Sequence, residues 1–344
     1  MTILNMNRRS FISAAITTPF ILKAGVSRAA AAIKFSLAAP FDGSNAAFFL
    51  AQQNGWYKDA GLECQFDAGG GSGEAVSRVG SGVYDAGIAD INSMAEFNAK
   101  NAGATIRMVY MVYFRSPLCV GTLAKSGIAK PGDLVGKTIG AAAPDGAYRL
   151  FSTYAKAAEI DPATVKWNMV GLQLREAVLA GGDADAILGF DSTIYFGLIK
   201  AGIKPDDIRF LYYADAGLDL YGNGIILSEK FRNQSPEAAK AFVDVSARAW
   251  QAAAVDPKAA IAALKAHAPL INADLEEQKL LWLIKNQMTT EESRANGLGA
   301  IDEGKLVKSM KAVAAGFGLP SVPRPEDVFD PSFLPSAEVR KLPA

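Results

Sequence analysis

The sequence contains little cysteine and little histidine. Among its 344 residues there are two cysteines, Cys64 and Cys119, and one histidine, His267. Two cysteines cannot build a disulfide framework; they are able to pair in an oxidising compartment, but we expect two unpaired, buried thiols. A lone histidine without cysteine or carboxylate neighbours at ligand spacing argues against a zinc site. We therefore expect no metal and no cofactor.

The chain also lacks an excess of charge of either sign. Lys plus Arg and Asp plus Glu number 35 each, so no strongly basic face is expected, which argues against nucleic acid or an anionic membrane as the main partner. The apolar run at residues 11–22 is too short to span a bilayer, and no later run is long enough, so we expect no stable membrane insertion. Hydrophobic residues make up 50% of the chain and charged residues 20%, as in a well-packed α/β protein.

The first 32 residues are typical of an export signal. Arg8 and Arg9 precede the short apolar run, and small residues follow at 29–32, as a cleavage site requires. The sequence Arg-Arg-Ser-Phe-Ile resembles a twin-arginine signal, although a general secretory signal with two arginines is the alternative. We expect the mature protein to begin near Ile33, to carry a net charge of −4 once the four basic residues of 1–32 are removed, and to reside in the periplasm.

Strand and helix patterns alternate after residue 33. Short apolar runs predict strands, and helices with one apolar face follow them, beginning near Ser44, Ser72, Asp90, Asp145, Leu174 and Asp191. This alternation favours mostly parallel sheets with helices on their faces. The predicted strands lie at 33–39, 61–66, 84–89, 137–142, 165–170, 186–190 and 221–227.

Two segments about a hundred residues apart follow the same plan. Residues 82–90 and 182–191 each place Gly-x-x-Asp-Ala at a helix end, then a buried strand, then an aspartate that begins the next helix. The matching order of elements around these segments predicts two lobes of similar topology.

Four motifs carry a family resemblance. They are the small and apolar run ending in Gly-Trp-Tyr and Gly-Leu at 45–62, Gly-Ser-Gly-Val-Tyr-Asp-Ala-Gly at 80–87, Pro-Gly-Asp-Leu-Val-Gly-Lys-Thr-Ile-Gly at 131–140, and Tyr-Gly-Asn-Gly at 221–224. In this order the chain resembles periplasmic solute-binding proteins of ABC importers in the thiamine-pyrimidine-precursor, sulfonate, taurine and nitrate group. The last motif is most similar to the pyrimidine-precursor branch.

The resemblance implies a bilobal α/β fold, the type II periplasmic binding protein fold. Two mostly parallel sheets flanked by helices would be joined by two interlobe crossovers, with lobe one at 33–120 and 216–344 and lobe two at 121–215. It implies a monomer that captures a small molecule between its lobes and delivers it to an ABC permease and its ATPase subunit. Thiamine-pyrimidine precursors, sulfonates, nitrate and aromatic carboxylates are the candidate ligands.

Ligands of open α/β sheets bind at the carboxyl ends of the strands, where this chain has polar, glycine-rich and aromatic residues. Asp90 and Asp191 also fit a helix N-cap role alone, and Tyr148 and Tyr221 fit core packing. Arg115, near the first crossover, suits an anionic ligand group but also a surface ion pair. The full predicted set is Phe41, Asp42, Ser44, Asn45, Gly70, Gly71, Ser72, Asp90, Arg115, Asp145, Gly146, Tyr148, Phe190, Asp191 and Tyr221.

We expect a binding protein and no catalytic residues. Fungal pyrimidine-precursor synthases belong to the same resemblance, but they are similar to a pattern with a cysteine-rich loop where this chain has Gly-Ala-Ala-Ala-Pro at 140–144. They also require a histidine in the cleft, whereas His267 falls in the C-terminal helical region. The alternatives are such a synthase-like enzyme and the ligand-binding component of a sensor.

Overall fold

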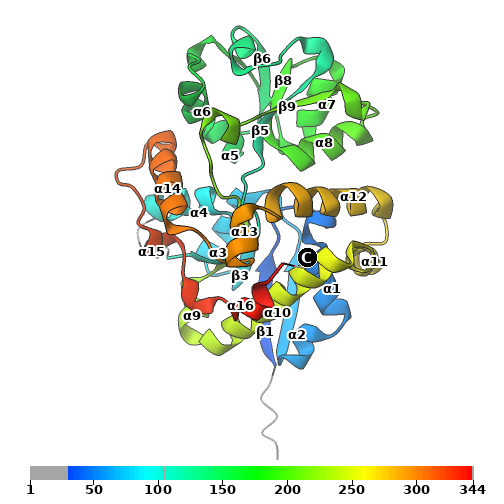
Figure 1. Cartoon of the computed structure of the whole chain (residues 1–344), viewed down its shortest axis with the longest axis vertical. Coiled ribbons are helices and arrows are strands. Elements are labelled where there is room, and N and C mark those ends of the chain that lie inside the picture. The colour runs from blue at the N-terminus through cyan, green and yellow to red at the C-terminus, as the bar shows by residue number, and fades with distance from the viewer. Residues whose placement is uncertain (1–29, 102, 104, 144, 343–344) are drawn as a thin grey trace, which may run out of the picture.

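The structure, a computed structural model, describes residues 30–101, 103, 105–143 and 145–342. It has two lobes, each built on a five-stranded sheet (Figure 1). The first sheet has the order β2-β1-β3-β10-β4, with β1 (Ala31–Ser36), β2 (Leu62–Asp67), β3 (Ala86–Asp90), β4 (Arg107–Met111) and β10 (Asn223–Leu227). The second has the order β7-β6-β8-β5-β9, with β5 (Leu118–Leu123), β6 (Thr138–Ala141), β7 (Lys166–Met169), β8 (Ala186–Phe190) and β9 (Ile208–Tyr212).

The two sheets share one topology. In the first, β1 pairs in parallel with β2 and β3, while β10 runs antiparallel between β3 and β4. In the second, β6 pairs in parallel with β7 and β8, while β5 runs antiparallel between β8 and β9. Each antiparallel strand has just arrived from the other lobe. The predicted bilobal α/β fold with similar lobes is therefore confirmed, with one antiparallel strand in each sheet.

Two segments cross between the lobes. Residues 112–117 connect β4 to β5, and residues 213–222 connect β9 to β10. The expected boundary between residues 120 and 121 falls inside β5, which belongs whole to the second sheet, so lobe two begins at about Leu118. The physical reason for this difference is that all six residues of β5 are buried and continue one strand, whereas Pro117 directly precedes its start. The expected boundary at 215/216 falls within the second crossover.

The predicted export signal lies outside the described residues except at its end. Ala31 and Ala32, which the prediction assigned to the signal, pair with Leu62 and Glu63 as the first residues of β1. The described chain therefore enters lobe one two residues earlier than expected.

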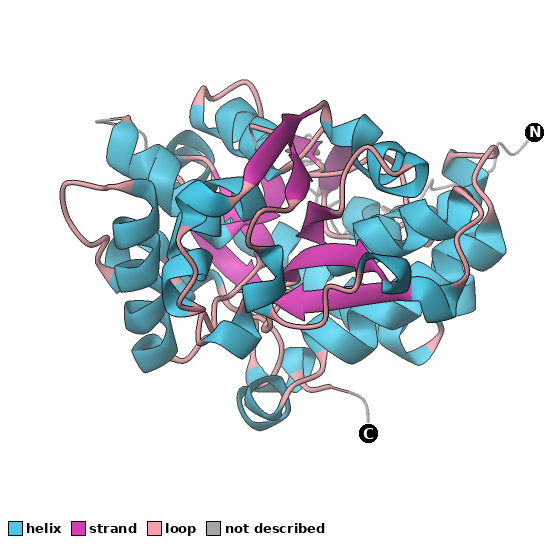
Figure 2. Ribbon diagram, turned by 90° about the horizontal axis from the view of Figure 1, so that it is seen from above, coloured by secondary structure: helices cyan, strands magenta, loops and turns pink. Residues whose placement is uncertain are grey.

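Helices cover both faces of the sheets (Figure 2). Lobe two carries α5 (Gly146–Arg149), α6 (Phe151–Ala157), α7 (Arg175–Gly181) and α8 (Asp191–Lys200). Lobe one carries α1 (Ala46–Gln53), α2 (Trp56–Asp59), α3 (Ser72–Gly80), α4 (Ile91–Lys100), α9 (Glu229–Gln234), α10 (Pro236–Val255), α11 (Pro257–His267), α12 (Ala273–Leu283), α13 (Glu291–Asn296), α14 (Glu303–Phe317), α15 (Pro325–Val328) and α16 (Ala337–Arg340). A π-helical turn (Ile284–Met288) continues α12.

Each lobe has its own core. In lobe one, Phe35 of β1 lies between Phe48 of α1 and Phe242 of α10, with ring centroids 4.8 Å and 5.4 Å away. In lobe two, Tyr154 and Tyr213 stack with centroids 4.3 Å apart. Separate cores allow the lobes to move as units about the crossovers. Among the described residues, no helix combines the length and apolar character that crossing a bilayer requires.

Candidate functional site

Four aspartates occupy equivalent positions at the interface between the lobes. Asp42 follows β1 and Asp90 ends β3 in lobe one, while Asp145 follows β6 and Asp191 follows β8 in lobe two. Each carboxylate accepts a backbone N–H at the start of the next helix, so the strand–helix turn fixes its position. The side chains are nonetheless almost fully buried, and those of Asp42, Asp145 and Asp191 have partners beyond their own turns. Buried carboxylates at matching strand ends make this interface the candidate site.

Asp42 is held by a lysine from the C-terminal region. Lys279 of α12 forms an ion pair with its carboxylate, and Ser44 and Asn45 donate to the same group. Burial alone would lower the pKa of Lys279, but the adjacent carboxylate of Asp42 raises it above its ordinary value. The ammonium is therefore charged and already occupied.

Asp145 is paired in the same way within lobe two. Arg175, the first residue of α7, forms an ion pair with it and donates to Leu188 O at 2.8 Å. Burial raises the pKa of Asp145, although the guanidinium of Arg175 opposes the shift. The guanidinium side chain is only 6% exposed, so its charge, too, is committed to the protein.

Asp191 joins the two lobes. Its carboxylate accepts hydrogen bonds from Trp282 Nε1 at 3.1 Å and Gln287 Nε2 at 2.9 Å, both from lobe one, and from Tyr212 OH at 3.1 Å. Burial raises the pKa of Asp191 to about 6 despite these donors. Tyr113 of the first crossover lies near as well: burial raises the pKa of its phenol, and the carboxylates of Asp42 and Asp191 add to the shift.

Asp90 brings the glycine-rich loop into the site. Its backbone N–H donates to Ser72 Oγ at 3.0 Å, and its carboxylate accepts from the N–H groups of Asn92 and Ser93. Burial raises the pKa of Asp90 to about 6. The loop approaches lobe two, because a Cβ added at Gly71 would lie 3.6 Å from Leu172 Cδ1.

Two further contacts close the interface on the side of α4. A Cβ added at Gly146 would lie 3.6 Å from Ser93 Oγ, and Arg149 of lobe two forms an ion pair with the buried Glu96 of lobe one. Phe190 packs against the cores of both lobes.

The cations of this interface are thus paired, whereas several acceptor oxygens are not. Among the described residues, four buried oxygens from the interface region have no hydrogen-bond partner: Asn92 Oδ1, Glu96 Oε2, Asn223 Oδ1 and Gln287 Oε1. Asn223 is 6% exposed and pairs with Asp90 across β10 and β3, which places it at the sheet edge that faces lobe two. It lies in the Tyr-Gly-Asn-Gly motif, so its sequence context was available although it was not predicted.

Four predicted residues have other partners. Phe41 packs against Phe49 and His267, and Tyr148 packs against Trp167. Arg115 lies 3.5 Å from Asp215 in an exposed ion pair. Tyr221 is fully buried, and its hydroxyl bonds Glu292. The other predicted residues lie at the strand ends or in the loops beside them, and their role in ligand binding stays a prediction: Asp42, Ser44, Asn45, Gly70, Gly71, Ser72, Asp90, Asp145, Gly146, Phe190 and Asp191.

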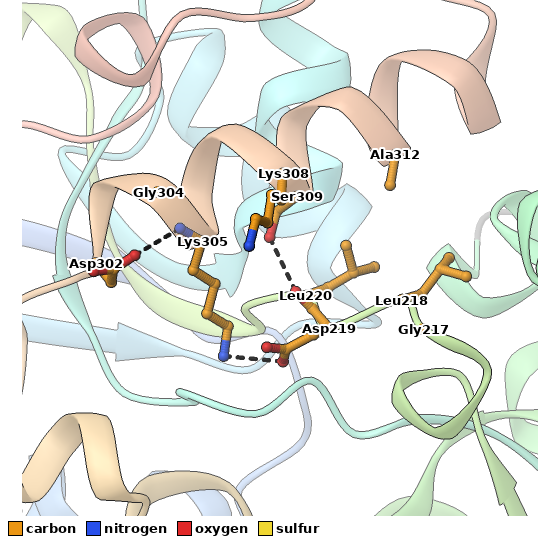
Figure 3. Close-up of a pocket in the computed structure, with 10 residues that line it drawn as sticks. All are labelled: Gly217, Leu218, Asp219, Leu220, Asp302, Gly304, Lys305, Lys308, Ser309 and Ala312. Atoms are coloured by element: carbon orange, nitrogen blue, oxygen red, sulfur yellow. Dashed lines mark hydrogen bonds and ion pairs between the residues drawn. The ribbon is translucent and has the colours of Figure 1, made fainter.

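Two cavities lie outside this interface. One, of about 220 Å³, lies between residues 217–220 of the second crossover and α14 (Figure 3). The other, of about 450 Å³, lies in lobe one between α4 and residues 321–328.

Both cysteines are free thiols, Cys64 half-buried and Cys119 buried. In the part of the chain that the structure describes, no group of three His, Cys, Asp or Glu side chains is placed to hold a metal ion.

The doubled topology and the polar interface between two lobes define a bilobal binding protein fold. The chain belongs to the NMT1/THI5-like family, whose sequence model matches residues 43–260. No curated protein sequence matches the chain.

Solved structures agree with this assignment. The alkanesulfonate-binding protein SsuA from Xanthomonas axonopodis pv. citri, bound to MOPS, is 17% identical with a TM-score of 0.67, covering 87% of this chain and 99% of its own. The periplasmic aliphatic sulphonate binding protein SsuA from Escherichia coli is 14% identical with a TM-score of 0.68, covering 89% and 94%. A Candida albicans gene product with the generic periplasmic binding protein fold is 18% identical with a TM-score of 0.65, covering 87% and 96%. At these identities the likeness establishes the fold, and the predicted family resemblance is confirmed.

Proposed function

We propose that the protein is the periplasmic solute-binding subunit of an ABC importer, which captures a small molecule between its lobes and delivers it to a permease and its ATPase. One observation carries the proposal: buried Asp191 of lobe two accepts hydrogen bonds from Trp282 and Gln287 of lobe one. These bonds cross from one lobe to the other, so they favour the closed form that a captured ligand selects. The SsuA structures, which are sulfonate-binding, support the same role by their fold.

The placement of the histidine supports a role in binding over one in catalysis. His267 lies at the end of α11, where its exposed ring packs against Phe41 and Phe49. It does not belong to the polar groups that join the lobes, so a cleft histidine of the synthase type has no counterpart among the described residues.

An export signal of the twin-arginine type would deliver the protein to the periplasm, and cell fractionation of an Arg8→Lys, Arg9→Lys variant tests that route.

The polar groups of the interface favour a ligand that donates hydrogen bonds. Lys279, Arg175 and Arg149 are each paired with a carboxylate, so none is free to bind a sulfonate, nitrate or carboxylate. The unpaired groups are oxygens, including Asn223 Oδ1, and a buried acceptor without a partner is costly. A planar heterocycle with amino groups, such as a thiamine-pyrimidine precursor, meets this requirement better than the anions.

Calorimetric titration of residues 30–344 tests the ligand class. The panel is an aminopyrimidine, an alkanesulfonate with MOPS, nitrate and an aromatic carboxylate, each confirmed by thermal shift. A ligand at a hundredfold excess over its Kd should stabilise the protein by about 2.7 kcal/mol. We expect aminopyrimidine binding that falls at least tenfold in Asn223→Leu and is unchanged in Asn233→Leu, an exposed control. Tight sulfonate or nitrate binding would contradict the ligand class, and no binding by any panel member would count against the role.

A further inference from the structure

Helix α14 spans the hinge between the lobes. It packs against α4 and α15 of lobe one and also against α6 of lobe two, beneath which it stands in Figure 1. Its first turn lies beside the crossover residues 217–220 (Figure 3). One rigid helix therefore contacts lobe one, lobe two and the connection between them.

Lys305, in the first turn of α14, is bonded to both crossovers. Its ammonium donates to Phe114 O of the first crossover at 2.8 Å and lies 3.0 Å from Asp219 Oδ1 of the second. It also lies 4.6 Å above the ring of Tyr221 and 3.7 Å from Glu292 Oε2. The side chain is 18% exposed, so these contacts are partly shielded from water. A single ammonium thus attaches both interlobe segments to lobe one.

A cavity lies beside the second crossover, next to Lys305. Residues 217–220 and α14 enclose a cavity of about 220 Å³, across which Asp219 is held by Lys305 and by a bond from Ser309 Oγ to its carbonyl at 3.3 Å (Figure 3). Leu218 and Leu220 of this segment are buried in the lobe two core, whereas Asp219 between them bonds α14, so the Lys305 contact links the second crossover to lobe one.

The other end of α14 depends on a glycine to contact lobe two. A Cβ added at Gly316 would lie 2.3 Å from Thr153 Oγ1 and 2.9 Å from Leu150 Cδ2. Beside it, the ring of Phe317 lies 5.0 Å from the guanidinium carbon of Arg149. A side chain at position 316 would therefore have to displace Thr153 and Leu150, where α14 meets lobe two.

We propose that α14 is a hinge brace that positions the lobes for ligand capture. Lys305 anchors the two crossovers to lobe one, and Gly316 allows lobe two to seat against the far end of the helix when the lobes close. The brace acts on the lobe positions before any ligand binds, so it can be tested without knowing the ligand.

Spin labels in the two lobes measure the brace directly. Lys58→Cys and Lys166→Cys, at exposed sites of lobe one and lobe two, carry the labels in a Cys64→Ser background, with buried Cys119 left in place. Double electron–electron resonance then gives the interlobe distance distribution of the ligand-free protein. We expect Lys305→Met to have a broader distance distribution than the parent. Lys305→Arg, which keeps the positive charge, should have a distribution narrower than that of Lys305→Met. Lys308→Met, an exposed lysine of the same helix, is the control and should match the parent.

The Gly316→Ala variant distinguishes an effect on the interlobe distance from an effect on the stability of helix α14. Alanine in place of a helix-interior glycine normally raises the melting temperature. The brace instead predicts a shift of the distribution toward longer distances, whereas Gly304→Ala, whose Cβ meets no residue of lobe two, should not shift it. A parent-like distribution in Gly316→Ala would overturn the closing contact, and a parent-like width in Lys305→Met would overturn the anchor. Neither result depends on the proposed ligand or importer.

Discussion

Mild acid should stabilise this protein, and the cause lies in two buried aspartates. Asp90 ends β3 and Asp191 directly follows the equivalent strand β8, and burial raises the pKa of each to about 6. In the unfolded chain an aspartate has a pKa of about 3.9. Between these values the native protein binds protons that the unfolded chain does not, so the free energy of unfolding falls as the pH rises through 6.

The size of the effect follows from the two pKa values. From pH 5 to pH 7 the native carboxyl passes from mostly protonated to mostly ionised, while the unfolded carboxyl stays ionised. Linkage then gives a loss of about 1.3 kcal/mol of unfolding free energy for each group over this range. Burial raises the pKa of Asp145 as well, so its contribution has the same sign.

Urea unfolding at pH 5, 6 and 7 measures these contributions. The parent should lose at least about 2.6 kcal/mol between pH 5 and pH 7. Asp191→Asn and Asp90→Asn keep the side-chain shape but remove the titration, so each should lose about 1.3 kcal/mol less than the parent. The comparison uses the change in unfolding free energy between pH 5 and pH 7. Any effect of the asparagine amide on stability that is independent of pH therefore cancels. Variants with the parent's pH dependence would refute the reasoning.

Three further stability changes follow from the structure, each measurable by urea unfolding. Gly69→Ala should cost about 3 kcal/mol, because its Cβ would lie 2.0 Å from Leu37 O, a backbone atom that cannot rotate away. Arg175→Met should cost about 3–5 kcal/mol by leaving Asp145 buried without its ion pair; Arg175→Lys should recover part of this. Phe35→Ala should cost about 4 kcal/mol through a cavity in the lobe one core.

The strand–helix alternation was predictable from the sequence because apolar periodicity and polar turns are local signals. β8 was predicted at its observed bounds, and β3 and β6 within two residues at each end. The strands β4, β5 and β9 were not predicted. They flank the crossovers, and their pairing with strands from distant parts of the chain is a long-range property that no local pattern reveals.

The site was predictable to the extent that it rests on strand ends. All four aspartates of the interface were named, because each follows a buried strand and begins a helix. Their partners were not named: Lys279, Trp282 and Gln287 come from helices far along the chain, with no motif to distinguish them. Their role arises only when the C-terminal region folds back over lobe one.

The two lobes share a topology, but their equivalent aspartates, Asp90 and Asp191, take hydrogen bonds from different parts of the chain. This difference has a mechanical consequence. In lobe one, Asp90 is satisfied locally by Asn92 and Ser93 of its own helix. In lobe two, the equivalent Asp191 takes donors from the C-terminal region of lobe one, which lobe two has no copy of. Opening would therefore strip hydrogen bonds from Asp191 and leave Asp90 unchanged. The same C-terminal region supplies α14 beside the crossovers. The donors that reach Asp191 and the helix beside the crossovers thus both come from the part of lobe one that the shared topology does not contain.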